Sequence, residues 1–137
     1  MIDIKLQQDQ KVYFSSDQHF GAPDPESSRE REKTFVKWLD EIKSDCHSLF
    51  IVGDLFDFWF EYKKVVPKGF VRVLGKLAEL KDAGINVYLF VGNHDLWMRD
   101  YFPTEFNIPV FHQPQQLSIN GSRVYLAHGD GLGPGDQ

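Results

Sequence analysis

Short apolar runs alternate along the chain with longer segments in which apolar residues recur at helical spacing. The runs at 12–15, 49–52 and 87–91 are typical of strands that are buried on both faces. This alternation is found in α/β proteins, whereas helical bundles and all-β barrels lack it. The pattern therefore predicts an α/β sandwich whose first part is two β-α-β units.

The segment between the first two runs has the pattern of a surface helix. Phe35, Leu39 and Ile42 lie three or four residues apart among charged residues, so they form one apolar stripe. Ser27 followed three residues later by Glu30 is a capping-box pattern, in which each side chain can bond to a free amide of the first turn. We therefore expect the helix to start at this pair.

A second helix is expected from about Pro67 to Ala83. Val73 and Leu77 belong to its apolar stripe, and Gly84 supplies a C-cap. This helix would connect the second and third strands.

After residue 111 the pattern becomes that of a hairpin. The segments 116–119 and 123–127 flank Asn120-Gly121, a dipeptide typical of two-residue turns between antiparallel strands. We expect the sheet to become mixed at this point. The glycine-rich segment 129–137 is expected to be a loop.

Composition limits the size and the location of the protein. A length of 137 residues, 42% of them hydrophobic, suits one domain or part of one. A net charge of -5 argues against nucleic acid as a partner. Cys46 is the only cysteine, which excludes disulfides and thiolate-rich zinc sites. Because no apolar run reaches the roughly 20 residues of a membrane span and the N-terminus lacks a signal-peptide core, we expect a cytoplasmic protein.

Each predicted strand is followed by residues that can bind a metal ion. In open α/β sheets ligands gather where the carboxyl ends of the strands meet. Taken singly, such residues can be explained as turn residues or helix caps. Their coincidence at four strand ends favours a metal site. The first two candidates, Asp17 and His19, are separated by one residue, so in an extended chain their side chains would project to the same side. The candidates are Asp17, His19, Asp54, Asn93, His94, Asp95 and His128.

These residues resemble the ordered motifs of calcineurin-like metallophosphoesterases, namely Asp17-x-His19, Gly53-Asp54, Gly92-Asn93-His94-Asp95 and His128-Gly129. The resemblance covers nearly the whole chain and implies an α/β/β/α sandwich with a mixed sheet. It also implies two divalent metal ions. Asp17 and His19 would bind one ion. Asn93 and His128 would bind the other, and Asp54 would bridge both. Oxygen and imidazole ligands suit Mn²⁺, Fe or Zn²⁺, of which we expect Mn²⁺.

The resemblance also implies a hydrolytic mechanism. Two cations roughly 3.5 to 4 Å apart neutralise phosphoryl oxygens and acidify water, which lets hydroxide attack an anionic ester. His94 would donate a proton or hydrogen bond to the leaving oxygen, with Asp95 orienting its ring. The alternative for His94 is a structural role beside the metals.

One motif of the family has no counterpart in the chain. The family pattern ends with Gly-His-x-His, which supplies one further ligand to each metal, and nothing after His128 matches it. His47 precedes a strand and His112 falls outside the motif order, so neither is a good substitute. We expect residues 1–137 to be the N-terminal portion of one metallophosphoesterase domain, incomplete at its C-terminus, or another chain to complete the site. An incomplete domain would expose apolar surface and an unpaired strand edge, which would favour a homo-oligomer.

Two aromatic extensions narrow the resemblance. Residues 53–60 and 92–98 resemble the UDP-2,3-diacylglucosamine pyrophosphatases of bacterial lipid A synthesis, which release UMP and 2,3-diacylglucosamine 1-phosphate. That branch implies a lipid-nucleotide substrate and peripheral association with the cytoplasmic face of the inner membrane. This chain departs from that branch at position 94, where it has His94 and the best-known members of the branch have Arg. A soluble phosphodiesterase or phosphatase of another phosphorylated small molecule, and a non-catalytic metal-binding domain, are the alternatives.

The first aromatic extension has two interpretations of its own. Phe56, Phe58, Trp59, Phe60 and Tyr62 could line an acyl or uracil site, or they could belong to a helix that packs against the sheet. Aromatic clusters more often fill cores than binding sites. We therefore expect Phe56 and Phe60 to be core residues.

Overall fold

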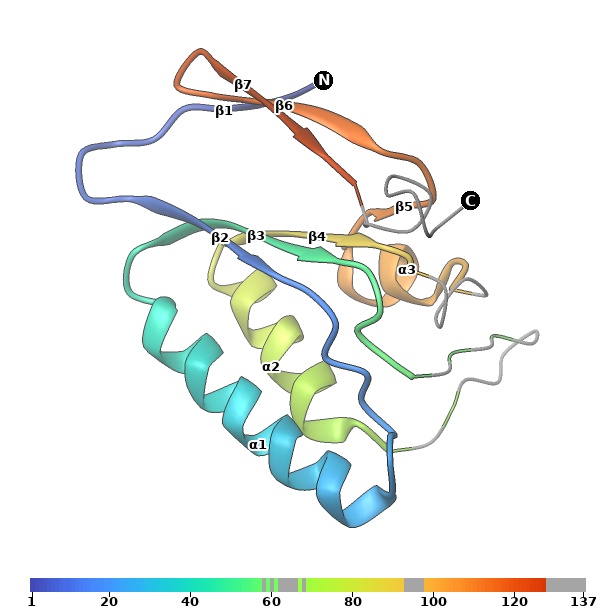
Figure 1. Cartoon of the computed structure of the whole chain (residues 1–137). Coiled ribbons are helices and arrows are strands. Elements are labelled where there is room, and N and C mark those ends of the chain that lie inside the picture. Colours follow the sequence, from blue (N-terminus) through green and yellow to red (C-terminus); the bar gives the residue numbers. More distant parts are fainter. Residues whose placement is uncertain (58, 60, 62–66, 68, 93–97, 128–137) are drawn as a thin grey trace.

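The structure is a computed structural model that describes residues 1–57, 59, 61, 67, 69–92 and 98–127 (Figure 1). Its elements, in chain order, are β1 (Ile2–Ile4), β2 (Lys11–Ser15), α1 (Pro25–Ile42), β3 (Cys46–Val52), α2 (Val71–Asp82), β4 (Asn86–Phe90), α3 (Tyr101–Phe106), β5 (Val110–Phe111), β6 (Gln115–Ile119) and β7 (Ser122–Leu126). None of the helices formed by these described residues is long and apolar enough to cross a bilayer.

The strands form two stacked sheets. One is parallel, with strand order β2-β3-β4-β5, and the other has the order β1-β6-β7. The helices cover one face of the parallel sheet and the second sheet covers its other face (Figure 1). Successive side chains of β3 alternate between the two cores, because Leu49 and Ile51 pack with the helices while Phe50 and Val52 pack with the second sheet. The predicted α/β sandwich with two β-α-β units is confirmed.

The hairpin is confirmed, but it does not join the parallel sheet. Asn120 and Gly121 have φ angles of 50° and 86°, the positive values that a type I′ turn requires. β6 pairs antiparallel with β7 and parallel with β1, so the mixed sheet is a separate layer. The sequence pattern did not reveal β1, because three residues are too few to show alternation.

Helix α1 starts two residues before the predicted capping box. Asp24 is the N-cap, and its side chain accepts a hydrogen bond from Ser27 N at 2.8 Å. Pro25 takes the first helical position, where its fixed φ suits the helix and its missing N–H costs nothing. The expectation that Ser27 caps this helix was wrong, because Asp24 offers an earlier and charged acceptor.

Helix α2 starts later than predicted, at Val71 and not at Pro67. Phe70 has a left-handed φ of 59°, which interrupts any helix before it. The first turn is capped from a distant part of the chain, because Glu32 of α1 is buried and accepts Val73 N at 2.9 Å. Gly84 follows the helix with a φ of 90° and its N–H bonds to Lys81 O, as predicted for the C-terminal end.

Strand β2 is less buried than the pattern suggested. It lies at the edge of the described parallel sheet, and Phe14 is 45% exposed. β3 and β4 are covered on both faces as expected.

The aromatic segment after β3 belongs to the core. Phe56 and Trp59 are fully buried and their rings pack against Phe102 of α3. Phe56 forms a β-bridge with Phe20 and is not part of a helix, which corrects the helical interpretation. Phe58, Phe60 and Tyr62 lie outside the described residues, so the prediction for them stays open.

Candidate metal centre

The site begins where β2 and β3 end at the same edge of the parallel sheet. Past the strand ends, Asp17 N donates to Gly53 O at 3.2 Å and His19 N donates to Asp54 O at 2.9 Å. Backbone pairing between the two loops continues as far as residue 57. The sheet therefore holds the first two motifs side by side.

Three of the predicted ligands come together here. Asp17, His19 and Asp54 each offer one ligand atom, and these atoms all lie within 4.8 Å of one another. His19 Nε2 lies 3.9 Å from Asp17 Oδ1 and 3.8 Å from Asp54 Oδ2. Two carboxylates and an imidazole are a donor set that suits Mn²⁺, Fe or Zn²⁺, so these residues fit a divalent cation.

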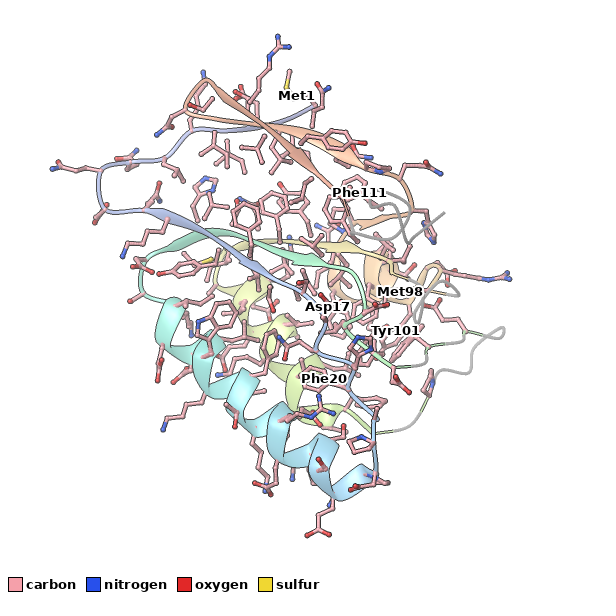
Figure 2. All side chains as sticks on the ribbon, in the orientation of Figure 1. Met1, Asp17, Phe20, Met98, Tyr101 and Phe111 are labelled. Carbon is pink, nitrogen blue, oxygen red and sulfur yellow. The ribbon has the colours of Figure 1, made fainter. Side chains whose placement is uncertain are left out.

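The three ligands differ in exposure. Asp54 is buried, whereas the side chain of Asp17 is 58% exposed and that of His19 is 32% exposed. Figure 2 shows Asp17 on the same side of the molecule as Met98 and Tyr101, near the carboxyl ends of the strands. A cation held here would have protein on the Asp54 side and solvent on the Asp17 side.

The backbone at all three ligands is left-handed. Asp17, His19 and Asp54 have φ angles of 59°, 50° and 53°, a region that costs a non-glycine residue on the order of 1 kcal/mol. The expectation of an extended chain between Asp17 and His19 was therefore wrong. Their side chains meet because each backbone is paired with the loop after β3, and not because of strand alternation.

Just beyond strand β4, Gly92 packs directly against Asp54. A Cβ atom at Gly92 would lie 2.2 Å from Asp54 Oδ1 and 2.7 Å from Asp54 N, so only glycine fits this approach. Asn93, His94, Asp95 and His128 lie outside the described residues. Their assigned roles as ligands and catalytic groups remain predictions.

Sequence reasoning missed Asp57, which reaches the other nitrogen of the imidazole. Asp57 Oδ1 lies 3.7 Å from His19 Nδ1, longer than a hydrogen bond but close enough to act electrostatically. A carboxylate on the far nitrogen of a metal-binding histidine fixes its tautomer and raises its basicity. The signal in the sequence was the second aspartate of Gly53-Asp54-x-x-Asp57.

Sequence reasoning also missed Glu61, which joins the segment after Asp54 to helix α3. Its buried carboxylate accepts Trp59 Nε1 at 2.9 Å and Tyr101 N, at the start of α3, at 3.0 Å. One side chain therefore fixes the segment that follows Asp54 to the helix that follows residues 93–97. No local sequence pattern predicts this contact between Glu61 and Tyr101, because the two residues are 40 positions apart.

Two relatives that carry the same name match most of this chain. A relative from Porphyromonas gingivalis named UDP-2,3-diacylglucosamine hydrolase is 41% identical over 120 residues, which are 88% of this chain and 46% of the relative. A protein of the same name from Ralstonia nicotianae is 31% identical over 88% of this chain and 44% of its own length. The chain thus spans about half the length of the curated relatives it matches.

A solved structure and a family model complete the comparison. A protein of unknown function from Aquifex aeolicus shares the fold, with a TM-score of 0.59 and 21% identity over 90% of this chain and 62% of that one. The family model described as calcineurin-like phosphoesterase matches residues 10–134. The chain belongs to the calcineurin-like phosphoesterase family.

Proposed function

We propose that this calcineurin-like phosphoesterase hydrolyses the pyrophosphate of UDP-2,3-diacylglucosamine, giving UMP and 2,3-diacylglucosamine 1-phosphate. The observation that carries the proposal is the convergence of Asp17, His19 and Asp54 at one sheet edge. The substrate rests on the names of the relatives that are 41% and 31% identical to the chain.

The proposed centre holds two divalent ions, with Mn²⁺ first and Fe or Zn²⁺ as alternatives. Asp17 and His19 would hold one ion. Asn93 and His128 would hold the other, with Asp54 shared between them. When bound, such ions supply Lewis-acid charge for a phosphoryl group and lower the pKa of water.

The described residues prepare this site in distinct ways. His19 directs Nε2 toward Asp17 and Asp54, and Nδ1 toward Asp57. A cation bound at Nε2 would leave the imidazole proton on Nδ1, the nitrogen that faces Asp57. Asp54 is buried and would form the bottom of the site. Asp17 is more exposed and lies on the side from which substrate would enter.

His94 and Asp95 complete the proposed mechanism. His94 would donate to the leaving oxygen as it develops charge, and Asp95 would orient the ring. Their support is that they follow Gly92 in the sequence, and Gly92 itself packs against Asp54.

We further propose that residues 1–137 are the N-terminal portion of the metallophosphoesterase domain. The assigned residues give each ion three protein ligands, and a Gly-His-x-His motif elsewhere in the polypeptide, or in another copy, would add one to each. The same proposal places the protein at the cytoplasmic face of the inner membrane. It also includes self-association through the face that an incomplete domain would leave uncovered.

The test separates the three candidate functions by substrate. Release of UMP from UDP-2,3-diacylglucosamine, dependent on Mn²⁺ and on the acyl chains, is expected. Turnover of only bis-p-nitrophenyl phosphate would favour the soluble phosphodiesterase. Mn²⁺ binding without turnover in the complete protein would favour the non-catalytic domain.

The ligand deficit is tested by comparing two forms of the polypeptide. The 137-residue chain should bind Mn²⁺ more weakly, turn over less and show a larger molar mass by light scattering than a form extended through a Gly-His-x-His motif. Full occupancy, full activity and a monomeric mass for the shorter form would refute the incomplete site.

A further inference from the structure

We infer that Arg31 is a positioning residue that holds the first metal-binding loop, residues 17–22, in the shape that presents His19. The inference rests on the proposed metal centre. Arg31 lies on α1, and its guanidinium reaches back across the loop that precedes the helix.

The guanidinium forms a fork of hydrogen bonds to the loop backbone. It donates to Gln18 O, to Ala22 O and, at 3.3 Å, to His19 O. Gln18 is the residue between the two ligands of the first motif, and His19 is itself a ligand. A planar guanidinium has five donors in a fixed arrangement, whereas a lysine ammonium is a single point of charge and cannot reach three separated carbonyls at once.

Other contacts from the same helix secure the loop. Ser28, one turn before Arg31, accepts Gly21 N at 2.6 Å. The guanidinium carbon lies 6.0 Å from the centre of the Phe20 ring, which is fully buried. Phe20 N bonds to Leu55 O in the neighbouring motif loop. Arg31 and Ser28 thus join helix α1 by polar contacts to a loop that is already anchored on its other side.

The backbone of the loop explains why such a contact affects metal binding. Asp17 and His19 are held in left-handed conformations that a free loop would rarely occupy. If the loop is ordered before metal arrives, binding does not bear the cost of ordering it. Loss of Arg31 removes its hydrogen bonds to three carbonyls, of which His19 O keeps the bond from Ala22 N. The loop can then relax, so the ligands must be reordered for each binding event.

The experiment measures Mn²⁺ affinity by the electron paramagnetic resonance signal of free Mn²⁺. Arg31→Ala should weaken binding about 10- to 100-fold, the range found when residues that support metal ligands are removed. Arg31→Lys should lie between Arg31→Ala and the unmodified chain. Arg29→Lys and Arg29→Ala make the same chemical changes at an exposed position of the same helix and should leave the affinity unchanged.

A second readout uses the metal-free chain. Amide hydrogen exchange at residues 19–22 should accelerate in both Arg31 variants, while exchange in β4 stays the same. Unchanged Mn²⁺ affinity together with a lower melting temperature would mean that Arg31 only stabilises the fold, and the inference would be wrong. If Arg31→Ala does not fold, Arg31→Lys decides the question.

Failure of the proposed function gives a different result. If a form extended through a Gly-His-x-His motif binds none of Mn²⁺, Co²⁺ and Zn²⁺, the metal centre itself is wrong. The positioning role is tested separately by hydrogen exchange of the metal-free chain. Unchanged exchange of residues 19–22 in Arg31→Lys would overturn it, whether or not the chain binds metal.

Discussion

At the amino ends of β2 and β3, Asp45 accepts hydrogen bonds from two side chains of the same sheet. Tyr13 Oη lies 2.7 Å from Asp45 Oδ1, and Lys11 Nζ lies 3.4 Å from Asp45 Oδ2. The hydrogen bond from Tyr13 and the nearby ammonium of Lys11 lower the pKa of Asp45, and the hydrogen bond to Asp45 raises the pKa of Tyr13 to about 12. His47 Nδ1 lies at hydrogen-bond distance, 2.8 Å, from Ser48 Oγ.

At the carboxyl ends of the same strands, acidic side chains gather around one imidazole. Asp17, Asp54 and Asp57 all approach His19 to within 3.9 Å. Both edges therefore carry aspartate and histidine. They differ in arrangement, because Asp45 is matched with a cation and a hydroxyl, whereas the other edge gathers three carboxylates on one ring. This difference distinguishes a structural contact from a candidate metal site, and residue type alone does not.

Substitution of Asp54 should separate the two edges most strongly. Asp54→Ala in the active enzyme should abolish turnover and lower the metal content of both sites, because in the proposed centre this carboxylate would space and neutralise two cations. Asp45→Ala is the matched control: it should keep its Mn²⁺ and its activity but melt at a lower temperature, since Tyr13 and Lys11 lose their acceptor. Near-wild-type activity of Asp54→Ala with saturating metal would eliminate the bridging role.

The histidines of the two edges provide the next comparison. His94→Ala should lower kcat roughly 10²- to 10⁴-fold with little loss of metal, because it would remove the proposed donor to the leaving oxygen. His47→Ala, at the other edge, should leave kcat unchanged. The loss at His94 should be greatest for substrates with basic leaving groups, and an equal loss with a very acidic leaving group would show that the general-acid assignment is wrong.

Glycine substitutions test how closely β4 approaches the site. Gly92→Ala should lower the unfolding free energy by about 1–3 kcal/mol and weaken Mn²⁺ binding, because the new methyl group collides with the Asp54 carboxylate. Gly75→Ala in α2 meets no atom within 4 Å and should stabilise the chain by about 0.5–1 kcal/mol. Urea unfolding and metal titration of both variants measure these effects, and equal results would contradict the close approach.

The smallest expected effect is the pH dependence of the stability that the Tyr13–Asp45 contact provides at the amino ends of β2 and β3. Because the folded pKa of Tyr13 is raised to about 12, its stabilising contribution is complete below about pH 10 and is lost as the pH rises toward 12. Asp45 has a lowered pKa, so its contribution is lost at the acidic end, as the pH falls below about 4. The difference in unfolding free energy between the unmodified chain and Tyr13→Phe should therefore shrink between pH 10 and 12. A constant difference would mean that the hydrogen bond to Asp45 contributes nothing.

The sequence by itself determined the elements whose cause is local. The buried run of β3, the apolar stripes of α1 and α2 and the Asn120-Gly121 turn each follow from residues that are neighbours in the chain. The order of polar residues at the strand ends also predicted that Asp17, His19 and Asp54 would meet, because parallel strands share one carboxyl edge.

Tertiary structure decided everything that depends on contacts between distant segments. The cap that Glu32 places on α2 spans 41 residues, and the fork that Arg31 places on the first loop spans 9 to 13. The left-handed backbone of Asp17 and His19 is fixed by pairing with the loop after β3, so the local sequence suggested the wrong conformation. A side chain can be assigned to a site from its place in a pattern. Its partners depend on how the helices pack on the sheet, which no short stretch of sequence encodes.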